Sequence, residues 1–114
     1  MESELLVIQK TYELYKHFTE CNSTITRSHR FGLGEKTLIT TLDLLEQLIQ
    51  AKHAGKSHKV HFLLVAAAKL EILRFQLRLY LDLKLVKETR VFQMQALVRD
   101  IGRQTGGWLK SVSR

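Results

Sequence analysis

The residues of this sequence with the clearest chemical potential are arginines spaced four apart. Arg74 with Arg78, and Arg99 with Arg103, would each share one face of a helix, where residues four apart are neighbours. A guanidinium group is planar and always charged, and its donors match the geometry of phosphate oxygens. These pairs therefore predict ridges of positive charge that contact a nucleic-acid backbone. The alternative is that each arginine is simply solvated or serves as a salt-bridge partner.

The charge of the whole chain favours an anionic partner. Eighteen lysines and arginines against eleven aspartates and glutamates give a formal net charge of +7. The segment from Lys84 onward contains seven basic and two acidic residues, so it carries more than half of this excess. The sign of the charge alone fits RNA, DNA or an acidic membrane. The sequence contains neither an aromatic RNA-binding platform nor a zinc finger, so we expect contacts with phosphates rather than with base edges.

Catalytic patterns are missing from the sequence. Acid-base catalysis needs titratable groups held in a pocket with separated pKa values, whereas the carboxylates here fall mostly on polar helix faces beside lysine or arginine. Glu71 with Arg74, and Asp82 with Arg78, are typical of ion pairs within one helix. There is no Gly-x-Ser-x-Gly motif and no glycine-rich loop before Lys-Ser or Lys-Thr. We therefore expect a protein that is not an enzyme and has no catalytic residues.

Histidines are the main candidate metal ligands. His53, His58 and His61 fall around one expected interhelical loop, and imidazole is a common ligand of zinc. No cysteine, aspartate or second histidine pair lies nearby to complete a tetrahedral set. Solvated or capping histidines are the favoured interpretation, and neither a metal nor another cofactor is expected. Gly32 and Gly34 open a helix, and we interpret them as permissive backbone rather than as an anion site.

Apolar residues recur at three- and four-residue spacing in four segments, which predicts four helices. Their expected ranges are about 3–20, 33–53, 58–86 and 89–109. The links between them are short, which places successive helices antiparallel. The expected fold is therefore all-α, a single up-down four-helix bundle that spans residues 1–114.

Caps and core-facing seams follow from the same pattern. Gly55 is expected to cap the end of the second helix, Ser57 to cap the start of the third, and Gly106-Gly107 to fray or end the fourth. The expected seams are Leu5, Ile8, Tyr12 and Tyr15 on the first helix, Leu38, Leu42, Leu45 and Ile49 on the second, and Val91, Met94, Val98, Ile101, Thr105 and Trp108 on the fourth.

The third helix has two apolar stripes, which lie roughly 155° apart by helical geometry. The first consists of Leu63, Ala66, Leu70, Leu73, Leu77 and Tyr80, and the second of Val65, Ala68, Ile72, Phe75, Leu79 and Val86. A helix in an isolated bundle needs only one broad stripe. The second stripe therefore predicts an oligomer interface at Val65, Ile72, Phe75 and Leu79. The alternative is that both stripes are internal to one protomer.

The remaining features favour a cytoplasmic protein. The single cysteine, Cys21, has no partner for an internal disulfide, and we interpret it as a small hydrophobic residue near a helix end. The acidic first residues are not those of a signal peptide. The most apolar stretch, Phe62 to Val86, is interrupted by six charged residues, so no membrane span is expected.

Three stretches of the sequence stand out: Arg30–Gly34 (RFGLG), Leu70–Leu79 (LEILRFQLRL), and Ile101–Arg103 (IGR) with Gly106–Lys110 (GGWLK). They resemble the accessory variability determinant (Avd) proteins of diversity-generating retroelements, and the likeness covers nearly the whole chain. Gln104 and Thr105 depart from the apolar residues that are usual there in the family. Avd proteins belong with the bacterial four-helix-bundle proteins encoded in 23S ribosomal-RNA intervening sequences. Those relatives usually carry an Ile-Ala-Glu-Gly-like stretch at the start of the second helix, so the RFGLG form favours the retroelement branch.

The resemblance implies a protomer of a pentameric barrel that binds the retroelement reverse transcriptase and template RNA during mutagenic cDNA synthesis, with DNA as a second nucleic-acid partner. The reverse transcriptase would do the chemistry. Positions that match the family's basic residues are Arg30, Arg74, Arg78, Arg103 and Lys110. Lys69 and Arg99 complete the expected nucleic-acid-binding set.

The alternative function is a structural or ribosome-associated role of the intervening-sequence type. Gene neighbourhood separates the two hypotheses. A nearby reverse transcriptase with variable and template repeats indicates a retroelement, whereas insertion in a ribosomal-RNA gene indicates the alternative.

Overall fold

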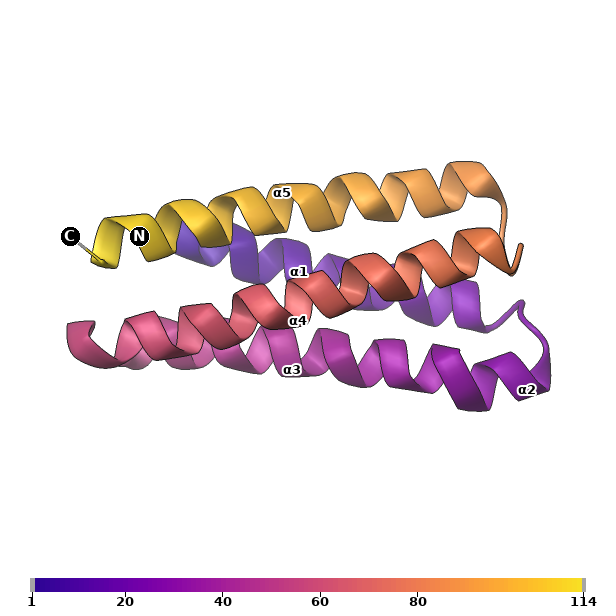
Figure 1. Cartoon of the computed structure of the whole chain (residues 1–114), viewed down its shortest axis with the longest axis horizontal. Coiled ribbons are helices and arrows are strands. Elements are labelled where there is room, and N and C mark those ends of the chain that lie inside the picture. The colour runs from indigo at the N-terminus through magenta and orange to yellow at the C-terminus, as the bar shows by residue number, and fades with distance from the viewer. Residues whose placement is uncertain (1, 114) are drawn as a thin grey trace.

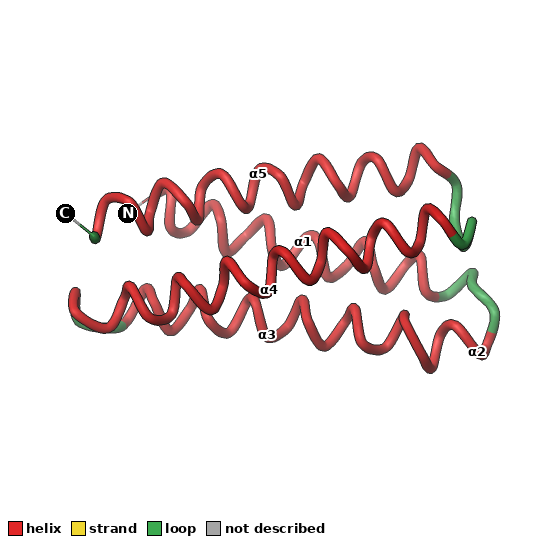
Figure 2. The backbone as a smooth tube through the Cα atoms, viewed as in Figure 1, coloured by secondary structure: helices red, strands yellow, loops and turns green. Residues whose placement is uncertain are grey.

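Helices make up most of the computed structural model, which describes residues 2–113, with side chains from residue 4 onward. The four long helices, antiparallel from one to the next (Figure 1), are α1 (Glu2–Asn22), α3 (Glu35–His53), α4 (Lys56–Asp82) and α5 (Glu88–Val112). Two short elements precede α3, namely α2 (Arg27–His29) and the π-helical turn η1 (Arg30–Gly34). Figure 2 shows the turns at the ends of the bundle, and the described residues form no strand. The expected all-α four-helix bundle is confirmed.

The four helices form a square in which each helix packs against two others. α1 contacts α3 and α5, and α4 contacts the same two helices. In Figure 1, α1 and α3 lie behind α5 and α4. The molecule, with extents of 45 × 23 × 19 Å, therefore has an α4–α5 face and an opposite α1–α3 face.

On α4 and α5 the interior side is the one that the sequence predicts. The first apolar stripe of α4 contributes all of its buried residues, and the buried residues of α5 are those of its expected seam. Ile72, Phe75 and Leu79 of the second α4 stripe lie at the surface, and Val65 is half-buried. The alternative in which both stripes are internal is therefore wrong.

On α1 and α3 the predicted seams are wrong. Leu5 and Tyr12 of α1 are 53% and 52% exposed, and Leu42 and Ile49 of α3 are 46% and 41% exposed. The remaining members of both seams are half-buried. The apolar core residues of these helices are instead Val7, Leu14, Phe18 and Cys21 on α1 and Leu44, Leu48 and Ala51 on α3.

Buried threonines explain why the predicted seams of α1 and α3 are wrong. Thr11, Thr37 and Thr41 are fully buried. The hydroxyl of Thr11 donates to the Val7 carbonyl oxygen, and that of Thr41 to the Thr37 carbonyl oxygen, each at 2.8 Å. Because these bonds satisfy the hydroxyl within its own helix, the threonine methyl packs in the core at little cost. α1 and α3 are thus apolar on two sides, and the side that contains threonine faces inward.

Asn22 links the end of α1 to η1 and α4. Its Nδ2 donates to the Gly34 carbonyl oxygen at 2.9 Å, and the Tyr80 hydroxyl donates to its Oδ1 at 2.6 Å. A Cβ atom at position 34 would lie 3.0 Å from the Asn22 amide. Gly34 therefore provides space for Asn22. Its φ of −59° is that of an ordinary helical residue, so the interpretation of Gly34 as permissive backbone is wrong.

Arg30 stabilises the turn that follows α1. Its Nε donates to the Asn22 carbonyl oxygen and its Nη2 to the Ile25 carbonyl oxygen, both at 3.2 Å. Helical structure is continuous from Arg27 to His53, so it begins earlier than the expected start near residue 33. The contacts of Arg30 and Gly34 hold a π-helical turn here that the glycine spacing did not indicate.

The boundaries of α4 also differ from the prediction. Gly55 precedes α4 as its N-cap, whereas Ala54 is the C-cap of α3 and Ser57 lies inside the first turn of α4. α4 ends at Asp82 because Lys84 adopts a left-handed conformation with φ of 54°. The Leu85 N–H then donates to the Tyr80 carbonyl oxygen at 3.0 Å and closes the helix end. A non-glycine residue in this conformation costs about 1 kcal/mol.

The helix stop predicted at Gly106-Gly107 is wrong, since α5 continues to Val112. The buried side chains of Thr105 and Trp108 flank the two glycines and keep this part of α5 against the core. Among the described residues, no helix combines the length and apolar character needed to cross a membrane.

Candidate nucleic-acid interface

Five basic side chains follow the α4–α5 face. Arg74 and Arg78 extend from α4, and Arg99, Arg103 and Lys110 extend from α5. All five are exposed. Within each helix their spacing keeps them on one side, and the two helices pack side by side, so we call this set the α4–α5 ridge.

The guanidinium group of Arg74 lies across the neighbouring helix at Gly102. A Cβ atom at position 102 would be only 2.5 Å from Arg74 Nη2. The glycine therefore provides the space that this guanidinium occupies. Arg74 also has no carboxylate within ion-pair distance among the described residues, so the Glu71–Arg74 pair predicted from the sequence does not form.

Arg74 and Arg99 line one hollow between α4 and α5. The hollow has a volume of about 260 Å³, and its other lining residues are Leu77, Gln95 and Val98. Guanidinium groups that approach from two helices present several fixed N–H donors to the same space. Such an arrangement is suited to a phosphate group because charge-assisted hydrogen bonds to oxyanions are short and strong.

The other two arginines of the ridge make ion pairs within their own helices. Arg78 Nε lies 3.7 Å from Asp82 Oδ2, which confirms the predicted Asp82–Arg78 pair. Arg103 Nη2 lies 2.8 Å from Asp100 Oδ1. The arginine side chains remain 71% and 73% exposed, and surface pairs of this kind contribute only about 0–1 kcal/mol. Each arginine can therefore exchange its carboxylate for a phosphate at small cost.

A comparison with protein families places this chain in a known group. A family model described as bAvd-like matches residues 5–112. The chain belongs to the bAvd-like family. The Avd resemblance predicted from the sequence is thereby confirmed.

The fold of this bAvd-like chain is shared with a solved structure. It is similar to a crystal structure, at 1.70 Å resolution, of a protein of unknown function from the S23 ribosomal protein family of Bacteroides thetaiotaomicron VPI-5482. The TM-score is 0.85 over 95% of this chain and 98% of that chain, with 12% sequence identity. At this identity the likeness shows the fold alone. No curated protein matches the chain in sequence.

Two residues of the predicted binding set lie away from the ridge in the bAvd-like chain. Arg30 holds the turn after α1, as described above. Lys69 points to the α3 side of α4, where its Nζ lies 3.5 Å from Asp43 Oδ2 and its side chain is 29% exposed. Arg30 belongs to the predicted set by family position and Lys69 by charge, and neither property reports the direction of a side chain.

Sequence reasoning missed the parts of the site that carry no charge. Gly102 provides space for Arg74, and Gln95 lines the hollow beside Arg99. The spacing of Gln95, Arg99 and Gly102 places them on one side of α5, which is the signal that could have identified them.

Within the part of the bAvd-like chain that the structure describes, the histidines form no metal centre. His53 and His58 line a pocket of about 510 Å³ with Gln50 and Phe62. His61 is exposed, and its ring lies 5.4 Å from that of Phe62. No group of three histidine, cysteine or acidic side chains suited to a metal ion occurs among the described residues.

Proposed function

We propose that this bAvd-like chain is a non-catalytic accessory protein of a diversity-generating retroelement. It binds template RNA, and DNA, through the α4–α5 ridge and acts with the reverse transcriptase of the element in the cytoplasm. The reverse transcriptase performs mutagenic cDNA synthesis. The observation that carries the proposal is the ridge itself, in which five cations are exposed on adjoining helices of a chain with a net charge of +7.

Phosphate contacts dominate this mode of binding. Each contact releases condensed counterions, so the affinity falls with salt by about 0.7 log units per log unit for each contact on a single strand. The ridge has Arg74, Arg78, Arg99, Arg103 and Lys110 for such contacts, whereas Arg30 and Lys69 are engaged within the protomer. Binding through the ridge is therefore sensitive to salt and tolerant of sequence.

Removal of two ridge arginines tests the RNA-binding proposal. We expect Arg74→Gln with Arg78→Gln to weaken binding of a single-stranded RNA about tenfold and to reduce the salt slope by about 1.4. Fluorescence anisotropy at several salt concentrations measures both quantities. Lys16→Gln with Lys36→Gln removes the same charge from α1 and α3 and is the matched control. Equal losses in the two double variants, or an affinity independent of salt, would refute binding at the ridge.

Association with the reverse transcriptase is the second part of the proposal, and family membership supports it. The test is co-purification of the chain with the reverse transcriptase of the same element, with the template RNA present and after nuclease treatment. Recovery in both conditions indicates a direct contact between the proteins. Failure to recover the enzyme in either condition contradicts this part of the proposal and leaves RNA binding by the ridge unaffected.

We also propose that the protein is a homo-oligomer, for which the Avd resemblance implies five copies. Two separate surfaces carry apolar side chains. One is the outer side of α4 with Ile72, Phe75 and Leu79, and the other is the α1–α3 face. Large apolar patches on a protein surface commonly mark interaction sites. A contact between the two surfaces in neighbouring copies covers both of them.

An intervening-sequence role is the alternative function, and the fold similarity to a protein from the S23 ribosomal protein family favours it. In that case the positive surface serves association with ribosomal RNA. A gene located inside a 23S ribosomal-RNA gene supports this alternative, whereas a neighbouring reverse transcriptase and template repeat support the retroelement.

A further inference from the structure

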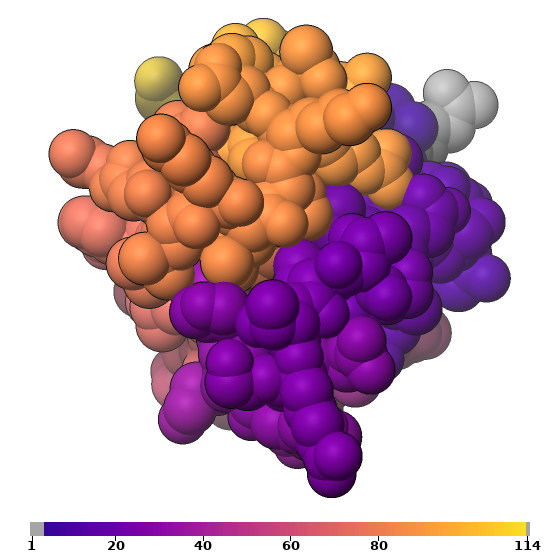
Figure 3. Space-filling model, turned by 90° about the vertical axis from the view of Figure 1, so that its right-hand side faces the viewer, coloured from indigo at the N-terminus to yellow at the C-terminus, as the bar shows by residue number. Residues whose placement is uncertain are grey.

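A cavity of about 780 Å³ lies at the end of the bundle where α1 ends and α5 begins. Figure 3 looks onto this end, where the turn between α4 and α5 (orange) adjoins the segment that follows α1 (purple). The cavity is lined by residues from the end of α1, from the α4–α5 turn and from the first turns of α5. Its size falls within the range of small-molecule sites in proteins.

Positive charge predominates in the lining of this cavity. Lys84, Lys87 and Arg90 line it together with one carboxylate, that of Glu20. Arg90 Nη2 donates to Glu20 Oε2, so the single acid is already paired. Among the described residues, Lys84 and Lys87 have no carboxylate within ion-pair distance. Two lysines therefore remain available to an anion.

Lys84 occupies a position where the backbone favours glycine. Its φ of 54° is left-handed, and the residue in this position at a helix end is usually glycine. A lysine here makes the turn less stable than glycine would. The need to end the helix therefore does not explain why residue 84 is a lysine. A role for the lysine side chain in the lining of the cavity does explain it.

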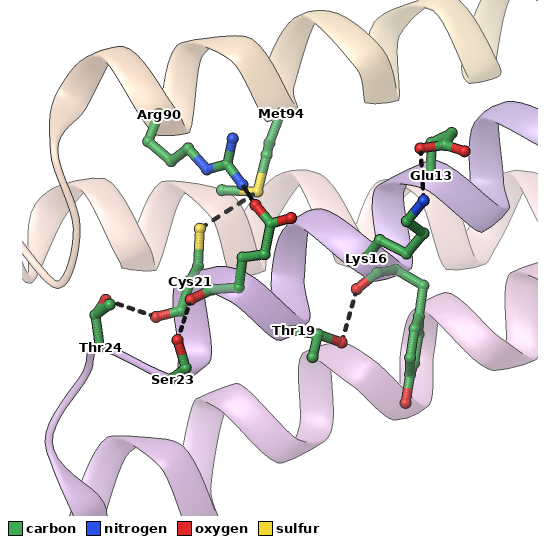
Figure 4. Close-up of polar contacts among 10 residues, drawn as sticks. Glu13, Lys16, Thr19, Cys21, Ser23, Thr24, Arg90 and Met94 are labelled. Carbon is green, nitrogen blue, oxygen red and sulfur yellow. Dashed lines mark hydrogen bonds and ion pairs between the residues drawn. The ribbon is translucent and has the colours of Figure 1, made fainter.

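Part of the cavity lining is apolar. Leu85 and Val86 are half-buried in the lining, and the buried Cys21 also lines the cavity, with its Sγ 3.9 Å from Met94 Sδ. Figure 4 shows Arg90 extending from α5 beside Met94 and toward Cys21. Apolar lining residues next to two unpaired lysines suit a ligand that carries a flat ring and a phosphate.

We propose that this cavity binds a nucleotide, with the phosphate held by Lys84 and Lys87 and the base against Leu85 and Val86. The site is separate from the α4–α5 ridge and does not depend on the retroelement role. Its ligand is either a free nucleotide or the phosphorylated end of a nucleic-acid strand, because both present the same chemistry.

Isothermal titration calorimetry with adenosine 5′-monophosphate tests this proposal. The nucleotide should bind about tenfold more tightly than adenosine, because charge-assisted hydrogen bonds to the phosphate are lost with the nucleoside. Lys84→Gly should weaken nucleotide binding about fivefold and at the same time raise the melting temperature, because glycine relieves the left-handed backbone. A structural role for the lysine would move affinity and stability in the same direction.

Charge-matched variants separate a built site from general attraction. Lys84→Gly with Lys87→Gln should remove measurable nucleotide binding, whereas Lys16→Gln with Lys36→Gln should leave it unchanged. Arg74→Gln with Arg78→Gln should also leave it unchanged, even if it lowers RNA affinity. The proposal is overturned if millimolar nucleotide does not bind, if adenosine binds equally well, or if the control pair weakens binding as much as the cavity pair.

Competition identifies the source of the ligand. A short strand with a 5′-phosphate should displace the nucleotide, and the same strand with a 5′-hydroxyl should not, if the cavity takes strand ends. Displacement by neither strand, with nucleotide binding intact, assigns the cavity to a free nucleotide. Loss of strand binding in the ridge variant supports the ridge, and unchanged strand binding in that variant refutes it. Neither result bears on nucleotide binding in the cavity, so the two proposals fail independently.

Discussion

Gly102 fixes the position of Arg74 on the ridge, because a methyl group at residue 102 would overlap the guanidinium. The displaced atoms are the far end of a flexible side chain, so the fold itself can accommodate the change. An alanine also favours the helix by up to about 1 kcal/mol relative to glycine. Gly102→Ala should therefore keep or raise the melting temperature.

RNA affinity should move in the opposite direction in Gly102→Ala. We expect a loss of about threefold to tenfold, because one phosphate contact loses its fixed donor geometry. Anisotropy with the same RNA and thermal unfolding measure the two effects on one preparation. Gly107→Ala, at a position with open space around it, is the matched control. Unchanged RNA affinity in Gly102→Ala would show that the position of Arg74 does not matter for binding.

Tyr80 makes the stability of the folded protein depend on pH in the alkaline range. Burial raises the pKa of Tyr80 to about 12, from an ordinary value of about 10. Between these values the unfolded chain loses the phenolic proton while the folded chain keeps it, so stability falls by about 1.4 kcal/mol per pH unit. Below pH 10 the contribution of this group is fully present.

Tyr80→Phe should remove this dependence and weaken the protein at neutral pH. The change leaves buried Asn22 Oδ1 without its donor, at a cost of about 1–3 kcal/mol. Denaturant unfolding of both proteins between pH 8 and pH 11.5 gives the comparison, in which lysine titration is common to both. The stability difference should be constant up to about pH 10 and then shrink. A difference that stays constant above pH 10 would contradict a raised pKa for Tyr80.

At the scale of elements, α5 contains two glycines that its fold does not require. A Cβ atom at Gly106 or Gly107 would meet nothing within 4 Å, and both positions are exposed within the helix. Gly106→Ala with Gly107→Ala should raise stability by about 1–2 kcal/mol, because glycine costs up to about 1 kcal/mol per helical position. Thermal unfolding measures this change in stability. Gly34→Ala is the contrasting variant, because Asn22 blocks a Cβ there, and it should destabilise. A loss of stability in the double alanine variant would show that the last turns of α5 need glycine.

The sequence predicted the elements well and their orientation only in part. On α5 the sequence has a single apolar stripe, and on α4 it has two. The α5 stripe and the first α4 stripe are the buried ones, as predicted. On α1 and α3 a leucine and tyrosine stripe competes with one that includes Thr11, Thr37 and Thr41, and hydropathy ranks the wrong one first. The ridge was predicted from the four-residue spacing of its arginines. The pairing of Lys69 with Asp43, and the contact of Arg74 with Gly102, depend on which helices are neighbours and could not be predicted from spacing alone.

At the scale of the whole molecule, the two apolar surfaces are different from each other. The α4 surface presents Phe75, and the α1–α3 face presents Tyr12 and Leu42. A two-fold dimer uses one patch on both subunits and would leave the other patch in water. A head-to-tail contact of the α4 surface with the α1–α3 face of the next copy covers both patches, and its repetition gives a closed ring when the rotation between copies is a whole fraction of a turn. This geometry agrees with the homo-oligomer that we propose.

Two single variants and their mixture distinguish the ring from a dimer. In a ring, every interface needs one α4 surface and one α1–α3 face, so Phe75→Glu and Leu42→Glu should each give monomers of 13.2 kDa in light scattering. A mixture of the two should form dimers and nothing larger, because each dimer joins the one intact surface of each variant. Both residues are exposed, so circular dichroism should confirm an unchanged helical content. If Leu42→Glu kept the mass of the unmodified protein while Phe75→Glu became monomeric, the contact would be two-fold through α4, and the head-to-tail arrangement would be wrong.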